Sequence, residues 1–175
     1  MKILIAILFT LGTIGFIGYS IYIYNYKYEL VIGSYIENAY EVNTPERMIA
    51  EISKAIKGME TENLKPEDYG AFFFKKPDNK MEWQYDFLDS IIERANAVIE
   101  WREKIEKSTE VETLGDVYEQ KMDNLREFLK ENGRADWIAS SAWVIKNHPI
   151  VYFWYVWLFP LAIITFFSWF LVSEV

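Results

Sequence analysis

Two long stretches of the chain contain no charged side chain. One extends from Ile3 to Tyr26 and the other from Asn147 to Ser173, and neither holds a Lys, Arg, Asp or Glu. A helix needs about 20 apolar residues to cross the ~30 Å hydrocarbon layer of a membrane. In lipid the backbone has to satisfy its own hydrogen bonds, as it does in a helix. The sequence therefore predicts a transmembrane helix near each end. The first run is too long for a signal peptide and lacks the expected cleavage site.

The charged residues lie almost entirely between these two runs, and the middle of the chain carries the net charge of −8. We expect an all-α membrane protein in which two antiparallel transmembrane helices flank a soluble helical-bundle domain of about four helices. The predicted segments are a first transmembrane helix, an acidic helical domain, a second transmembrane helix and a short tail, at residues 1–26, 27–148, 149–172 and 173–175.

Apolar spacing predicts the helices of the middle domain. Apolar residues continue at intervals of three and four beyond the first run, so that helix is expected to extend to about Val42. The sequence Asn43-Thr44-Pro45-Glu46 then offers a capping side chain, a proline for the first helical position and an early carboxylate, which indicates a new helix start. Further helices are expected over about 81–108, 112–132 and 134–147, with an irregular segment at 60–80.

The residues that most catalytic sites need are missing. The chain has one histidine, His148, and no cysteine. A multi-histidine metal site, a histidine-containing di-iron bundle and a thiol nucleophile are therefore excluded. No P-loop and no dinucleotide-binding glycine pattern occurs. The acidic balance argues against nucleic acid, because nucleic-acid-binding surfaces are basic. We expect no enzyme activity, no cofactor, no metal and no nucleic-acid partner.

Acidic residues repeat at helical spacing on two of the expected helices. They are Glu82, Asp86, Asp89 and Glu93 on one helix, and Glu112, Asp116, Glu119, Asp123 and Glu127 on the next. Facing each other, such carboxylates could bind Ca²⁺ or Mg²⁺. At about 100° per residue, however, each stripe lies nearly opposite the apolar face of its own helix. We expect two solvent-facing surfaces, and the alternative is a surface for a cation or a basic partner.

Aromatic residues mark the expected membrane boundary. Tyrosines occupy every second position from Tyr22 to Tyr28, which resembles a strand pattern, but on a helix these side chains surround the axis. A ring of amphipathic aromatic side chains suits the interface between membrane and water. The expected belt consists of Tyr22, Tyr24, Tyr26 and Tyr28 on the first helix and of Tyr152, Trp154, Tyr155 and Trp157 on the second.

Two further segments are candidate contact surfaces. Gly12, Gly15 and Gly18 lie three residues apart, which predicts a smooth patch for close helix packing in a membrane. A loop with three phenylalanines and two lysines either packs into the domain core or dips into lipid or a partner, with its lysines near headgroups. This loop consists of Phe72, Phe73, Phe74, Lys75 and Lys76.

These features favour a non-catalytic integral membrane protein that serves as an accessory or structural interaction subunit of a larger membrane assembly. Its partners would be membrane lipid and one or more proteins, contacted through the transmembrane helices or the helical domain. On the far side of the two predicted spans we expect only Met1 and Lys2 and the tail 173–175, so a signal would pass sideways between spans. We expect a multi-pass protein of the cell membrane with its domain outside the cytoplasm and both termini inside. The alternative is an extracytoplasmic sensory module that binds a ligand or a cation and relays through a membrane partner.

Overall fold

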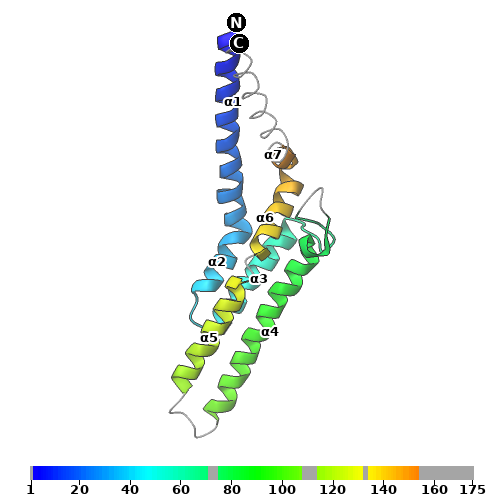
Figure 1. The fold of residues 1–175 in the computed structure, drawn as a ribbon. Helices are drawn as coiled ribbons and strands as arrows, with labels where there is room; N and C mark the ends of the chain where they lie inside the picture. The colour runs from blue at the N-terminus through cyan, green and yellow to red at the C-terminus, as the bar shows by residue number, and fades with distance from the viewer. Residues whose placement is uncertain (1, 71–74, 108–113, 132–133, 154–175) are drawn as a thin grey trace.

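The computed structural model describes residues 2–70, 75–107, 114–131 and 134–153 (Figure 1). Within these ranges it leaves out the side chains of residues 2–10, 24, 25, 78, 114, 131 and 134–137. The described chain is all-α and contains no strand, and Tyr69 and Lys80 form only an isolated antiparallel bridge. Its elements are α1 (Lys2–Tyr22), the π-helix η1 (Ile23–Gly33), α2 (Ser34–Glu41), α3 (Pro45–Thr61), the 3₁₀ turn η2 (Pro77–Asn79), α4 (Met81–Glu106), α5 (Leu114–Glu131), α6 (Arg134–Asn147) and α7 (Pro149–Phe153).

The described chain forms a helical bundle from which α1 extends as a long arm (Figure 1). Among the described residues, no helix combines the length and the apolar character that a membrane crossing requires. The predicted pair of transmembrane helices is therefore not found in this part of the chain. Residues 154–172 of the second predicted span lie outside it.

The first helix continues past the uncharged run, as the apolar spacing predicts. It ends with α2 at Glu41, and Val42 adopts an extended backbone conformation with φ −73° and ψ 148°. The sequence did not predict that the middle of this rod, η1, is a π-helix with hydrogen bonds from residue i to i+5. The buried residues follow the wider turn, since Ile23 and Tyr28 are five positions apart, and Ile32 follows four positions later.

Helix α3 packs closely against η1 at Gly58. A Cβ atom at this position would overlap the carbonyl oxygen of Val31, so only a glycine fits here.

The start of α3 is the predicted one. Thr44 accepts a hydrogen bond from the backbone N–H of Arg47 at 3.4 Å through its side chain, and Pro45 occupies the first turn. The buried face of α3 consists of Met48, Ile52, Ala55 and Met59.

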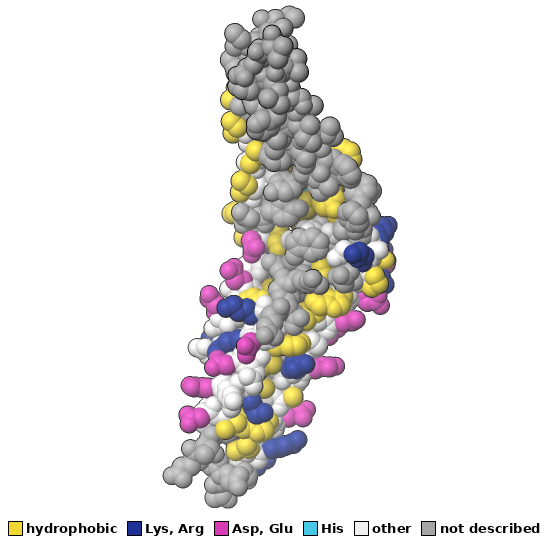
Figure 2. Space-filling view, viewed as in Figure 1, with side chains coloured by type: hydrophobic (Ala, Val, Ile, Leu, Met, Phe, Trp, Pro, Cys, Tyr) yellow, Lys and Arg dark blue, Asp and Glu magenta, His cyan; other side chains and the backbone are white. Residues whose placement is uncertain are grey.

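Helices α4 and α5 form the far end of the bundle (Figure 1). Both helices lie within the predicted ranges, and both bury the predicted apolar faces only in part. Phe87, Ile91, Ala95 and Val98 are buried on α4, whereas Val117 at the start of α5 is 37% exposed. The acidic residues of both predicted stripes that the structure describes are exposed, and Figure 2 shows many Asp and Glu side chains over the bundle.

The core lies where α4 crosses α3 and α6, with η1 packed against α3 and α6. It contains mostly aliphatic side chains and methionines, which fill irregular space well. One polar residue, Gln84 of α4, is completely buried, and neither its side-chain nitrogen nor its oxygen has a hydrogen-bond partner among the described residues.

Candidate functional site

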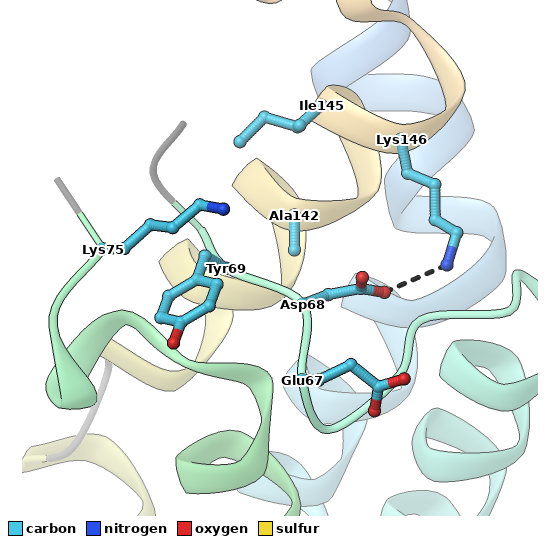
Figure 3. A pocket seen from close by; sticks show the side chains of 7 residues that line it. All are labelled: Glu67, Asp68, Tyr69, Lys75, Ala142, Ile145 and Lys146. Carbon is cyan, nitrogen blue, oxygen red and sulfur yellow. Dashed lines mark hydrogen bonds and ion pairs between the residues drawn. The ribbon is translucent and has the colours of Figure 1, made fainter. Parts of the chain in front are cut away.

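A cavity of about 270 Å³ opens between α6 and the loop that joins α3 to α4 (Figure 3). We call this the α6 pocket. Its lining combines two lysines, two carboxylates, a tyrosine and two aliphatic side chains. The lining residues are Glu67, Asp68, Tyr69, Lys75, Ala142, Ile145 and Lys146.

Backbone hydrogen bonds hold the loop side of the α6 pocket in place. The amide groups of Met81 and Glu82 donate to the carbonyl oxygens of Asp68 at 2.8 Å and Pro66 at 2.9 Å. These amides belong to the first turn of α4, where the backbone N–H groups have no partner within the helix. The loop therefore caps α4, and the capped helix in turn fixes the loop.

A hydrogen bond within the loop and a close approach to α6 also hold the loop in place. The Gly70 amide donates to the Asn79 carbonyl at 2.8 Å. An added Cβ at Gly70 would lie only 3.1 Å from the backbone Cα and O atoms of Ile138 in α6. The absence of a side chain at Gly70 thus allows the loop to approach α6 closely enough to form the pocket.

Asp68 and Lys146 form an ion pair in the wall of the α6 pocket, with Nζ and Oδ2 3.0 Å apart (Figure 3). The same Asp68 oxygen accepts the Lys65 amide at 2.7 Å, and Lys146 also donates to the carbonyl oxygen of Asn63. Each side chain of the pair is about one third exposed. Both charges are thus neutralised and held by several bonds.

The other two charged groups of the pocket are less engaged. The Lys75 ammonium lies 5.4 Å from the centre of the Tyr69 ring, and no described carboxylate is within 4.0 Å of it. The Glu67 side chain is 68% exposed, and its one described ion pair is a 4.0 Å contact with Lys65. The pocket therefore offers one cation and one anion that remain available to a ligand.

A cluster of aromatic rings surrounds His148 at the break between α6 and α7. Its ring centre is 5.1 Å from that of Trp143 and 6.4 Å from that of Tyr19 on α1. The Trp143 indole donates to Glu62 Oε2 at 2.8 Å, which ties α6 to the end of α3. The pKa of His148 is lowered from its usual value, first by burial and then by the charge of Lys27, while Glu62 acts in the opposite direction.

A second cavity, of about 680 Å³, lies between α2 and α5. Its main cation, Arg126, donates to the Val42 carbonyl at 3.0 Å, to Asn43 Oδ1 at 3.0 Å and to Asp123 Oδ1 at 2.7 Å. This arginine closes the turn between α2 and α3. Most of the Arg126 donors are thus already used, and Lys130 is the other cation that lines this cavity.

The structure places the predicted membrane belt residues in different surroundings. Tyr22 and Tyr26 are exposed and stack at 5.2 Å. Tyr28 is 1% exposed and packs against Trp143 at 6.1 Å, and Tyr152 is half-buried against the core. The side chains of Tyr24, Trp154, Tyr155 and Trp157 lie outside the described residues.

The two other predicted contact surfaces are described in part. An added Cβ at Gly12, Gly15 or Gly18 would meet no described atom within 4 Å. Lys75 and Lys76 are exposed, and Lys75 lines the α6 pocket. The adjoining residues Phe72, Phe73 and Phe74 lie outside the described part of the chain.

No group of three or more Asp, Glu or His side chains among the described residues is placed to hold a metal ion. The two acidic stripes are exposed. The described acidic residues therefore point away from the core, as the helical projection predicts, and Glu112 is outside this part.

Sequence reasoning singled out Lys75 and missed the rest of the α6 pocket. The Asp68 amide donates to the Lys65 carbonyl at 2.9 Å, which closes a turn with Pro66 at its second position, where proline is favoured. Nothing local pairs Asp68 with Lys146, because 78 positions separate them.

Comparisons of the chain with protein-family models, with curated proteins and with solved structures gave no match, so its function has to be argued from its own residues.

Proposed function

We propose that this protein is a membrane-anchored, non-catalytic interaction subunit. In this proposal the predicted transmembrane segments at residues 1–26 and 149–172 lie in lipid as two antiparallel helices. The helical domain sits outside the cytoplasm, both termini sit inside, and the α1 arm binds a helix of a protein partner. The proposal rests on the sequence of the two runs, parts of which lie outside the described residues.

The observation that carries the proposal is the apolar surface of α1. Leu11 and Ile14 are each 61% exposed and Ile21 is 55% exposed, so large aliphatic side chains face outward over several turns. Figure 2 shows hydrophobic side chains along the edge of the molecule that α1 occupies. Continuous apolar surface of this kind is typical of contact with lipid or a partner.

The face with Gly12, Gly15 and Gly18 supports a protein partner in addition to lipid. Small residues let two helix backbones approach closely, and packing between such faces drives helix association in membranes. Since an added Cβ at any of the three meets no described atom, the described chain leaves room for another helix there.

The test is to extract the full-length chain in a mild detergent and to measure its native mass with Gly15→Leu and Ile14→Leu variants. Gly15→Leu should release the partner because it fills the smooth face, and we expect at least a tenfold weaker association. Ile14→Leu keeps the size of an exposed neighbouring side chain and should leave association unchanged. A monodisperse lone chain in the unsubstituted protein would contradict the proposal, as would extraction from membranes by alkaline carbonate alone.

A further inference from the structure

We propose that the α6 pocket binds a small zwitterion, a molecule that carries an ammonium group and a phosphate or carboxylate group a few bonds apart. The inference does not depend on a membrane location or on a protein partner. It rests on the charge pattern, the size and the rigidity of the pocket.

The charge pattern of the lining selects a neutral ligand with separated charges. Lys75 and Lys146 balance Glu67 and Asp68, so the lining has no net charge. A lone metal cation in the pocket would be repelled by the two lysine ammonium groups. Inorganic phosphate would be repelled by the two carboxylates, because like charges repel inside a small cavity. A zwitterion avoids both costs because each of its charges can face the opposite one.

The free and the paired groups suggest how the ligand lies. The Asp68–Lys146 pair is already formed at 3.0 Å, whereas Lys75 has no described carboxylate partner. Figure 3 shows the Lys75 amine extending across the pocket toward α6. The anionic group of the ligand would therefore bind Lys75, and its ammonium group would lie toward Glu67 and Asp68.

The size and the stiffness of the pocket fit a small molecule. At about 270 Å³ the cavity lies just below the usual range of ligand sites. Ala142 and Ile145 offer aliphatic surface to the few carbon atoms between the two charged groups. The capped α4 and the close approach of Gly70 to Ile138 hold the wall before a ligand arrives, and such preorganisation lowers the free-energy cost of binding.

The test uses the full chain in a non-ionic detergent with glycerophosphoethanolamine as the probe, because its phosphodiester carries one negative charge that balances the ammonium group. Phosphate alone and ethanolamine alone serve as half-ligands. A ligand that binds the native state raises the unfolding temperature. We expect a saturable rise with glycerophosphoethanolamine, and either half-ligand should need an at least tenfold higher concentration for the same rise. A second arm adds phosphatidylethanolamine or phosphatidylglycerol to the detergent. A response to phosphatidylethanolamine would identify a lipid headgroup as the source, and a response to the soluble probe alone would identify a free ligand.

Matched variants separate the pocket from general surface charge. Lys75→Gln should weaken binding at least tenfold, whereas Lys76→Gln removes the same charge next to the pocket and should leave binding unchanged. Glu67→Gln should also weaken binding, with Glu103→Gln on the exposed surface of α4 as its control. The proposal is overturned if neither zwitterion source shifts the unfolding temperature, if phosphate alone acts as well as glycerophosphoethanolamine, or if Lys75→Gln and Lys76→Gln behave alike. None of these outcomes depends on partner binding, which is measured separately by native mass.

Discussion

Individual side chains show how tertiary packing changes what a local pattern means. Tyr28 belongs to an alternating run of tyrosines, yet its ring is buried while Tyr26 is exposed. Arg102 lies in the apolar arc of α4, and it is held by Glu46 at 2.5 Å and by Glu106 at 3.6 Å. The contact with Glu106 follows from helical spacing, whereas that with Glu46 requires α3 and α4 to be packed together.

Gln84 allows a direct test at this scale. A buried amide without hydrogen bonds costs free energy, and an apolar side chain of similar size removes that cost. We expect Gln84→Met to raise the free energy of unfolding by about 1–2 kcal/mol, as measured by urea denaturation. Gln84→Glu, which places a charge at the same site, should lower it. If Gln84→Met is destabilising instead, the amide has a partner outside the described residues.

His148 predicts how stability depends on pH. Its pKa in the folded protein is lowered, by burial first and by Lys27 second. The unfolded chain therefore takes up a proton at a higher pH than the folded chain does. The free energy of unfolding should be fully retained above about pH 6.5 and should fall as the pH drops from there through the lower folded pKa. With His148→Gln, the free energy of unfolding should depend less on pH in this window. If its slope against pH is the same in the variant, other groups cause the dependence.

At the scale of elements, the π-helix η1 is the feature that could not be predicted from the sequence. Within this stretch Tyr28 packs against Trp143 of α6, and Ile32 lies beside Gly58 of α3. Apolar spacing in a single sequence was compatible with an ordinary α-helix over the same residues. The close approach of Gly58 to the Val31 carbonyl goes with the π-helical winding, but Gly58 belongs to another helix, so local spacing does not reveal it.

Gly58→Ala tests this approach. In an open helix this substitution would stabilise by up to about 1 kcal/mol, but here the methyl group overlaps the Val31 oxygen. We expect a net loss of about 1–3 kcal/mol, seen as a lower midpoint in thermal unfolding. Gly115→Ala is the matched control because nothing described lies within 4 Å of its added methyl group. An equal response of the two variants would argue against tight packing of α3 on η1.

At the scale of the whole molecule, local signals predicted the order of helices, and long-range contacts decided the site. Thr44 and Pro45 predict the start of α3 because capping involves neighbours in sequence. The apolar face of α4 could also be predicted, because its residues recur at helical spacing within one segment. The α6 pocket was not, because it depends on Lys146 meeting Asp68 and on Gly70 touching Ile138. No helical period carries that information.

The unbroken rod from Lys2 to Glu41 has a mechanical consequence. Because α1, η1 and α2 follow one another without a loop, a torque on the arm reaches α2 directly and is not absorbed by a flexible joint. The π-helical stretch η1 lies in the middle of this continuous helix. If η1 rewound from five-residue to four-residue hydrogen bonding, α1 would rotate about its own axis while α3 and α4 kept their places. The direction in which Leu11 and Ile14 point is thus coupled to the winding of the chain beside Gly58.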